Sequence, residues 1–329
     1  MAKRKVYLKA DASSQIGYGH FTRTLALADI LKEDFDCTFF TSEPDEFQKS
    51  EIAKVCKVYS LSFETAQDEF LSILQGDEIV VLDNYYYTSE YQKQIKNTGC
   101  SLVCIDDIHD KHFYADVIIN HATGIIPGEY DIEKYTKLCL GTNYLLLRKE
   151  FFYASTLQAN RTMHRTFICF GGSDELNLTL QACKILKGID NREIIAVVGG
   201  GYLFMDELQE YAGSYNIRVY SNINAHKMVE LLLYSSLAIV PASTIFFETC
   251  CARIPIITGW FVDNQMLIAK GCEELGLGYN CGSLLVDFDK KLKKALAEIQ
   301  HGKDKEYVDK QNHVINISSY NLLKIFKEL

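Results

Sequence analysis

The chain has 329 residues, of which 48% are hydrophobic and 23% charged, and its formal net charge at pH 7 is −9. At roughly 150 residues per domain this length predicts two domains, and the acidic charge argues against a general nucleic-acid binder, which needs a basic face for phosphates. The longest apolar runs are far shorter than the ~20 residues of a membrane-spanning helix, so we expect no membrane partner.

The cysteines also indicate a cellular setting. The chain has 11 of them, mostly in apolar segments, and no Cys-x-x-Cys pair suggests zinc or redox chemistry. The basic stretch that begins at Met1 is not followed by the apolar run of a secretory signal peptide. We therefore expect reduced, structural thiols and a cytoplasmic protein.

The first half alternates short β-branched or aromatic runs with amphipathic stretches, which is typical of β-α units in a parallel sheet. Apolar spacing predicts a helix from Gly19 to Lys32. Strands are expected at Lys5 to Asp11, Cys37 to Thr41, Glu78 to Asn84, Ser101 to Asp107 and Ala115 to Asn120.

The second half repeats this rhythm after a polar stretch from Phe151 to His164. We therefore predict an α/β protein with two doubly wound domains, residues 1–155 and 156–329, and helices from Lys290 to the end. Ligands of such sheets bind at the carboxyl ends of the strands. The expected strands are Thr166 to Phe170, Glu193 to Gly199, Ile217 to Tyr220, Leu237 to Ala242 and Ile254 to Gly259.

Several carboxylates stand where a predicted first-half strand ends. These are Asp11, Asp83 and the pair Asp106 and Asp107. Each could cap the following helix, because Asp is a preferred N-cap, or line a site at the shared edge of the sheet. Both interpretations remain open for each residue.

The segment from Asp11 to His20 is the most informative stretch of the first half. Gly17 and Gly19 allow a tight turn and a close approach to a ligand at the start of the helix. The stretch is not a dinucleotide fingerprint, because Thr22 stands where the third glycine would be. His20 lies in the first helical turn, where the helix dipole favours the neutral ring, which can accept a proton.

Three stretches of the second half also follow predicted strands. Gly171, Gly172, Ser173 and Asp174 form a glycine turn like those that cradle phosphates. Ser243 and Thr244 could cap a helix or donate to a phosphate, while Glu248 could accept from ribose hydroxyls or close a capping box. Asn264 and Gln265 place amide groups after the next strand.

Together these motifs resemble the UDP-sugar hydrolase of pseudaminic acid biosynthesis, the PseG family, whose fold is similar to that of GT-B glycosyltransferases. The resemblance rests on Asp11 to Arg23, Gly171 to Asp174, Ser243 with Glu248, and Asn264-Gln265, in the expected order.

The resemblance implies two Rossmann-like domains of GT-B type with an interdomain cleft, with UDP held mainly by the second domain. It implies hydrolysis of UDP-2,4-diacetamido-2,4,6-trideoxy-β-L-altropyranose at the anomeric carbon, without a metal or cofactor. His20 corresponds to the general base, and either Tyr85 or Tyr86 matches a tyrosine of the family. The substrate-binding residues expected on this basis are Ser14, Gly17, Gly19, Arg23, Gly171, Gly172, Ser173, Asp174, Ser243, Thr244, Glu248, Asn264 and Gln265.

Several alternatives stay open. Asp11 or Asp83 could orient His20 or hold sugar hydroxyls. A glycosyltransferase would use the same UDP-sugar site with an acceptor in place of water, and an inactive UDP-sugar-binding module would need no base. Metal catalysis is less favoured, because Asp106, Asp107, His109 and His112 match no zinc spacing. The expected partner is a small UDP-sugar, and no protein partner is evident.

Overall fold

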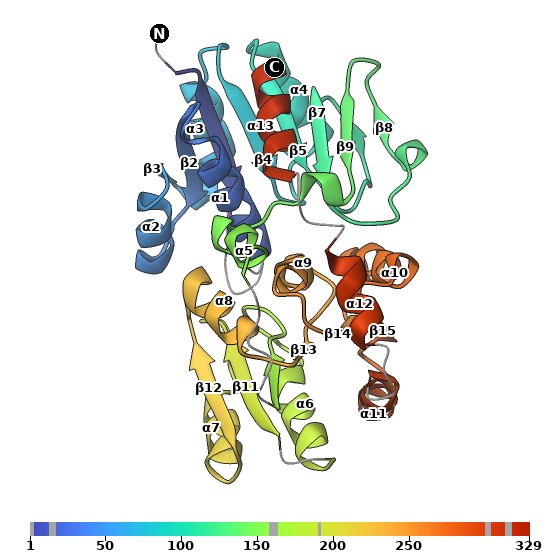
Figure 1. The fold of residues 1–329 in the computed structure, drawn as a ribbon. Coiled ribbons are helices and arrows are strands. Elements are labelled where there is room, and N and C mark those ends of the chain that lie inside the picture. The colour runs from blue at the N-terminus through green and yellow to red at the C-terminus, as the bar shows by residue number, and fades with distance from the viewer. Residues whose placement is uncertain (1–2, 13–17, 158–163, 190–191, 300–303, 313–317) are drawn as a thin grey trace. The chain divides into compact units, whose positions relative to one another are not determined.

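The structure is a computed structural model that describes residues 3–12, 18–157, 164–189, 192–299, 304–312 and 318–329 (Figure 1). The chain divides into two compact units, which we call unit 1 (Met1–Lys149 with Ile317–Leu329) and unit 2 (Glu150–Asn316). The predicted boundary after residue 155 lies close to the division at Lys149. The predicted domains differ at the C-terminus, because the final helix packs with unit 1.

Unit 1 is built on a seven-stranded sheet in the order β3-β2-β1-β4-β5-β7-β9, with every neighbouring pair parallel. A two-stranded ladder of β6 (His112–Phe113) and β8 (Asp131–Ile132) lies apart from it. The strands of the main sheet are β1 (Lys5–Ala10), β2 (Asp36–Ser42), β3 (Lys57–Leu61), β4 (Ile79–Asp83), β5 (Ser101–Ile105), β7 (Val117–Asn120) and β9 (Lys137–Leu140).

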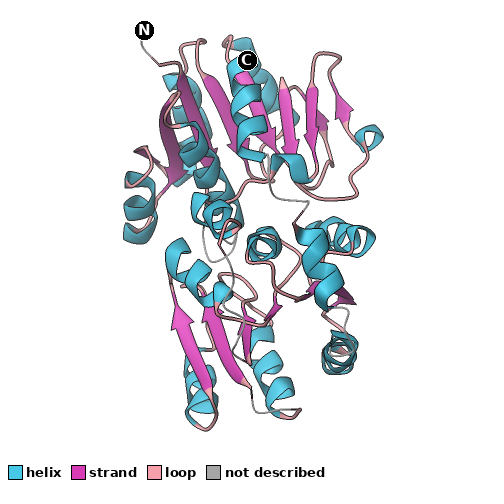
Figure 2. Cartoon of the chain, viewed as in Figure 1, coloured by secondary structure: helices cyan, strands magenta, loops and turns pink. Residues whose placement is uncertain are grey.

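Both faces of this sheet are covered, as Figure 2 shows for the strands and their flanking helices. Alternate residues of each central strand enter two separate apolar clusters: Val81 packs with the cluster under α1, and Leu82 with the cluster on the other face. Burial on both faces is the usual state of parallel strands. The helices are α1 (Gly19–Leu31), α2 (Glu46–Ala53), α3 (Ala66–Ile73), α4 (Ser89–Asn97) and the short α5 (Lys149–Ala154) at the boundary.

The last helix of the chain, α13 (Ser318–Glu328), completes the core of unit 1. Its buried Leu322, Ile325 and Phe326 join the cluster under α1, and the Phe326 ring lies 6.3 Å from that of Phe35. The red helix beside the sheet of unit 1 in Figure 1 is this segment. The terminal residues therefore belong to unit 1, because their apolar face is buried there.

Unit 2 repeats the design with a six-stranded parallel sheet in the order β12-β11-β10-β13-β14-β15. Its strands are β10 (Arg165–Ile168), β11 (Glu193–Val198), β12 (Ile217–Ser221), β13 (Leu237–Ile239), β14 (Ile256–Trp260) and β15 (Tyr279–Ser283). Its helices are α6 (Leu178–Lys187), α7 (Met205–Gly213), α8 (Ala225–Leu233), α9 (Thr244–Cys251), α10 (Met266–Leu275), α11 (Phe288–Glu298) and α12 (Asp304–Gln311).

The predicted class, two doubly wound α/β domains, is confirmed. In each sheet the first strand lies beside the second and the fourth, so the strand order reverses at this point. Ligands of doubly wound sheets bind at such switch points, outside the carboxyl ends of the strands. In unit 1 this position lies between β1 and β4, and in unit 2 between β10 and β13. No helix among the described residues is long and apolar enough to cross a membrane.

Candidate active site

The buried carboxylate of Asp83, at the end of β4, organises the switch point of unit 1. It is fully buried and contacts three side chains of α1. Arg23 donates two hydrogen bonds to it, from Nε to Oδ2 at 2.7 Å and from Nη2 to Oδ1 at 2.6 Å. Thr24 donates its hydroxyl to Oδ2 at 2.8 Å, and His20 Nδ1 lies 2.7 Å from Oδ1. Because His20, Arg23 and Thr24 follow one helix face, a single strand end fixes all three.

These contacts determine which nitrogen of His20 is available. Burial alone would raise the pKa of Asp83, but Arg23 and His20 hold it well below its usual range. An ionised carboxylate can only accept, so Nδ1 of His20 carries the proton that it shares with Asp83. Nε2 is therefore the nitrogen left to accept a proton. Arg23 Nη2 lies 3.1 Å from Nδ1.

Asp107 and Tyr85 extend this cluster. Asp107 Oδ2 accepts from Arg23 Nη1 at 2.8 Å and from the Tyr85 hydroxyl at 3.2 Å. The Tyr85 ring meets the His20 ring edge-on, with centroids 4.5 Å apart. His20 is 5% exposed, so its ring is almost completely buried. The network therefore joins the ends of β4 and β5 to the first turns of α1.

Asp11 lies in a second polar group, whose other members are Thr41, Ser42 and Tyr86. Its Oδ1 accepts from the Thr41 hydroxyl at 3.2 Å and from the Ser42 backbone N–H at 2.5 Å. Its Oδ2 accepts a hydrogen bond from the Tyr86 hydroxyl. Burial and the charge of Asp11 raise the pKa of Tyr86, so this hydroxyl stays protonated and donates. Of the two carboxylates left open above, Asp83 is the one that contacts His20.

Two predicted site residues of this region, Ser14 and Gly17, lie outside the described residues. Gly19 is exposed, and a Cβ added there would meet no atom of the described residues within 4 Å. Packing against that part of the chain therefore does not explain the glycine at that position. The residues that sequence reasoning missed are Thr24, Thr41 and Ser42; only Thr24 had a signal, its place four residues after His20 on the same helix.

The acidic and histidine residues after β5, which were considered above as metal ligands, bind different partners. Asp106 accepts from the His109 backbone N–H at 2.8 Å and from the Tyr130 hydroxyl at 3.0 Å, while Asp107 faces Arg23. His112 pairs with Asp131 and Glu133 at 2.9 and 3.2 Å. Within the described ranges, no group of three His, Cys, Asp or Glu side chains could hold a metal ion.

In unit 2 two glycine turns pack directly on each other. A Cβ on Gly199 would come within 2.5 Å of the Gly172 carbonyl oxygen, and Gly171 has a φ of +97°. Neither position accepts an ordinary side chain without strain. The turn after β10 and the turn after β11 thus form one glycine-lined edge, with Ser173 beside Gly201.

Asp174 serves the helix that follows this turn. Its Oδ1 accepts from the Leu178 N–H at 2.9 Å and its Oδ2 from the Thr179 N–H at 2.8 Å. Burial raises the pKa of Asp174, and these backbone donors oppose the rise. Since both oxygens bond to the start of α6, Asp174 holds the turn in place.

Helix α9, which follows β13, starts without a side-chain cap. Ser243 is the N-cap, yet its side chain makes no capping hydrogen bond, and the third helical residue is Phe246. The capping box considered from the sequence is therefore not formed. Glu248 is 3% exposed, one turn further along the helix. The first backbone N–H groups of α9 lie at the switch point of unit 2.

The amide pair follows β14 in a short turn, Asp263–Gln265. Gln265 is 8% exposed, and its Oε1 accepts from the Phe261 N–H at 3.1 Å. Its carbonyl thus fixes the turn, and its NH₂ group faces away from that bond. Asn264 lies beside it in the same turn.

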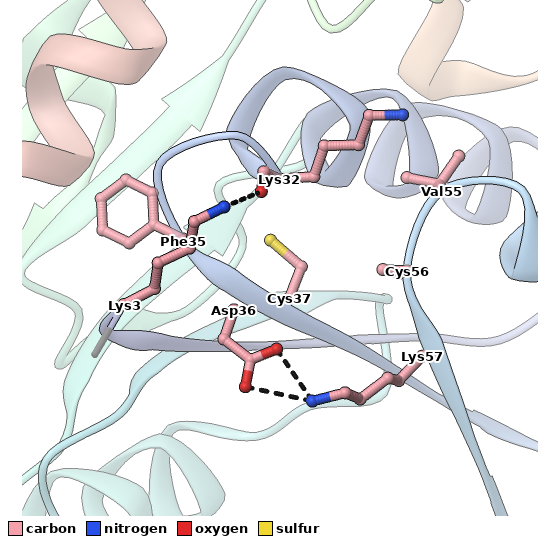
Figure 3. A pocket seen from close by; sticks show the side chains of 8 residues that line it. All are labelled: Lys3, Lys32, Phe35, Asp36, Cys37, Val55, Cys56 and Lys57. Atoms are coloured by element: carbon pink, nitrogen blue, oxygen red, sulfur yellow. Dashed lines mark hydrogen bonds and ion pairs between the residues drawn. The ribbon is translucent and has the colours of Figure 1, made fainter. Parts of the chain in front are cut away.

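A surface pocket lies elsewhere, at the amino ends of β1, β2 and β3 (Figure 3). Lys57 bonds both carboxylate oxygens of Asp36, and Lys3 donates to the Lys32 carbonyl at 3.0 Å. Burial raises the pKa of Cys37 to about 12, so its thiol is unreactive. This pocket has none of the groups gathered around Asp83, and we place the candidate site at the other edge of the sheet.

No protein-family profile matches the chain. The chain is 28% identical, over 79% of its length and 93% of the relative's, to the UDP-2,4-diacetamido-2,4,6-trideoxy-beta-L-altropyranose hydrolase of Campylobacter jejuni. The resemblance predicted from the motifs is confirmed. SpsG of Bacillus subtilis, a spore coat polysaccharide biosynthesis protein, is 24% identical over 83% of this chain and 82% of its own.

A third relative is longer. The uncharacterized protein MJ1062 of Methanocaldococcus jannaschii is 27% identical over 77% of this chain, and the match spans only 55% of that relative.

Solved structures show the same fold at low identity. MurG of Acinetobacter baumannii aligns with a TM-score of 0.67 at 12% identity, covering 99% of this chain and all of its own. UGT89C1 of Arabidopsis thaliana, solved with UDP, aligns with a TM-score of 0.68 at 11% identity, covering 98% of each chain. The fold is therefore the GT-B-like one expected from the motifs.

Proposed function

We propose that the protein hydrolyses a UDP-linked 2,4-diacetamido-2,4,6-trideoxy sugar to the free sugar and UDP. The observation that carries the proposal is the 2.7 Å contact between His20 Nδ1 and Asp83 Oδ1 at the switch point of unit 1. A histidine oriented by a buried carboxylate can act as a general base. The similarity to the Campylobacter hydrolase supports the substrate class.

In this reaction His20 Nε2 takes a proton from water while the water oxygen attacks the anomeric carbon. The bond from that carbon to the β-phosphate oxygen breaks on the opposite face, and its electron pair leaves with UDP. The configuration at the anomeric carbon is inverted. Asp83 stabilises the protonated ring that forms, and no metal is needed because UDP is already a good leaving group.

We assign the diphosphate to unit 2. Its glycine-lined edge at Gly172 and Gly199 lets a ligand approach the backbone, and the start of α9 offers N–H groups to an anion. Donors of this kind stabilise charge as it develops on the leaving oxygen. Ser243 and Thr244 add hydroxyl donors there, and Glu248 is assigned to the ribose hydroxyls.

The sugar is assigned to unit 1, where Asp11 follows β1, Tyr86 follows β4, and His20 lies in the first turn of α1. The product would enter nonulosonic acid and polysaccharide synthesis in the cytoplasm. UDP-bound GT-B-like neighbours support a UDP ligand, and a relative in polysaccharide biosynthesis supports this setting.

The proposal is tested by incubating the protein with the UDP-diacetamido-trideoxy sugar in the absence of any acceptor. UDP release and the first-formed anomer are followed by ³¹P and ¹H NMR, beside His20→Gln and an EDTA control. We expect UDP and the inverted anomer from the wild-type protein, a fall of at least ~100-fold in His20→Gln, and no effect of EDTA.

Other outcomes of the same experiment would contradict the hydrolase activity, the role of His20 or the absence of a metal. UDP release only after a second sugar or lipid is added would identify a glycosyltransferase. Binding of the UDP-sugar without turnover would identify a binding module. An unchanged rate in His20→Gln would remove the histidine from the mechanism, and loss of activity in EDTA would indicate a metal.

A further inference from the structure

Lys9, on β1, is the largest polar side chain that the structure buries completely. Leu8 and Ala10 point into the apolar cluster under α1, so the alternation of the strand turns Lys9 to the other face of the sheet. There its ammonium lies 5.7 Å from the ring centre of Phe70 and 5.6 Å from that of Tyr87. Both rings belong to the apolar cluster of that face.

This arrangement is unfavourable for folding. Among the residues that the structure describes, none accepts a hydrogen bond from Lys9 Nζ. Burial lowers the pKa of Lys9, and the charges of Asp11 and Glu69 offset only part of that effect. A buried charge without hydrogen bonds destabilises a protein, and an apolar side chain of similar length would fit the same place at lower cost. A costly buried group of this kind often has a functional role.

The surroundings of Lys9 connect it to the candidate sugar site. Its ammonium faces the ring of Tyr87, which is buried, and the Tyr87 hydroxyl lies 3.3 Å from that of Tyr86. The Tyr86 hydroxyl in turn donates to Asp11, and its side chain is 41% exposed. A chain of contacts thus runs from a buried cation to the hydroxyl of a partly exposed tyrosine beside the switch point.

We propose that Lys9 is a positioning residue for the site of unit 1: its buried ammonium holds the ring of Tyr87 and, through it, the Tyr86 hydroxyl on Asp11. The attraction between the cation and the ring face fixes Tyr87. The positive charge also complements the Asp11 carboxylate that Tyr86 bonds. This inference rests on the proposed function in one respect, the assignment of Tyr86 to the sugar site.

The first test compares Lys9→Met with Lys5→Met. Lys5 is on the same strand but half-exposed, with its ammonium 3.4 Å from Glu78. We expect Lys9→Met to unfold at a temperature at least ~2 °C higher than the wild type, and its kcat/KM for UDP release to fall by about 10-fold. Lys5→Met should keep its activity. A Lys9→Met protein as active as the wild type would overturn the proposal.

The second test asks whether Lys9 acts through Tyr86. If it does, Lys9→Met lowers kcat/KM little further in a Tyr86→Phe background, whereas additive losses contradict the proposal. In protein labelled with ¹³C at Cζ of tyrosine, Lys9→Met should shift the Tyr86 resonance and Lys5→Met should not. This resonance is independent of turnover. If the wild-type protein releases no UDP, the proposed function fails, and a shifted or unshifted Tyr86 resonance still decides the role of Lys9.

Discussion

Four donor atoms, from His20, Arg23 and Thr24, surround the Asp83 carboxylate and fill its acceptor positions. Charge-assisted hydrogen bonds to a fully buried group are strong and well ordered, so the orientation of the His20 ring is set before any ligand binds. Replacing Asp83 would therefore affect the proton on His20 and the charge of Arg23 at once.

We predict that Asp83→Asn lowers kcat for UDP release by about 10²- to 10⁴-fold, because an amide no longer fixes the tautomer of His20. Breaking the buried pair with Arg23 should also lower the free energy of unfolding by about 3–5 kcal/mol. Activity assays and denaturant unfolding measure the two effects. Asp36→Asn is the matched control, since Asp36 pairs with the exposed Lys57 at the other edge of the sheet, and it should change neither quantity much.

The same carboxylate predicts how stability depends on pH. Because its pKa is lowered on folding, the stability from Asp83 is fully present above the ordinary aspartate value of about 4, and it is lost as the pH falls below that value. Unfolding midpoints at pH 7 and pH 3 should therefore differ less in Asp83→Asn than in the wild-type protein. Equal differences in the two proteins would contradict this.

The sequence could not predict which strand-end aspartate has which role. Capping and site-building use the same residue type at the same kind of position. Asp174 caps α6 through the N–H of Leu178, a local contact, whereas Asp83 meets Arg23 across 60 residues of sequence. Only the packing of α1 against β4 brings the latter pair together.

At the scale of elements, α2 fixes both flanks of the segment that precedes His20. Asp45 and Gln48 form a capping box at the start of this helix. Gln48 Nε2 also donates to the Ala12 carbonyl at 3.1 Å, and the Tyr18 hydroxyl donates to Asp45 Oδ2 at 3.3 Å. One helix cap therefore holds the chain just after β1 and again just before α1.

We predict that Gln48→Ala lowers kcat/KM for UDP release by about 10-fold and the free energy of unfolding by about 1 kcal/mol. Thr88→Ala is the matched control, because Thr88 caps a different helix, α4, by accepting from the Tyr91 N–H. It should cost similar stability and leave activity unchanged. Equal loss of activity in both variants would mean that stability alone explains the effect.

Most central strands were predictable from sequence, and three strands at sheet edges were not. β4 reads as a continuous apolar run because both of its faces are buried. In β3 the residues Lys57 to Ser60 are exposed, so this edge strand has no apolar pattern to detect. β9 and β15 are also edge strands, and both mix buried with partly exposed residues.

At the scale of the whole molecule, the two units share one strand order, and each places glycine turns or helix starts at its switch point. The repeated alternation along the chain was enough to predict two doubly wound domains, but not the order of their strands. The packing of α13 against unit 1 was not predictable. The apolar pattern of a helix shows which of its faces is buried, but not which of two cores buries it. The interdomain cleft stays a prediction.

The net charge of −9 excluded a general nucleic-acid binder without excluding a diphosphate ligand. A diphosphate would be bound by backbone N–H groups at the start of α9 and at the glycine-lined edge of unit 2. These groups act at contact distance, whereas salt largely screens the more distant charges that make up the net charge. These local donors, and not the net charge, therefore decide whether the protein binds an anionic ligand.

The central claim is that water activated by His20 attacks the anomeric carbon of a UDP-sugar. The most direct measurement is turnover of the UDP-diacetamido-trideoxy sugar in H₂¹⁸O without an acceptor, with the released UDP analysed by ³¹P NMR. We predict UDP release with no ¹⁸O in the β-phosphate, because the bond from carbon to oxygen breaks. Appearance of ¹⁸O in the β-phosphate, or no release of UDP, would contradict the account.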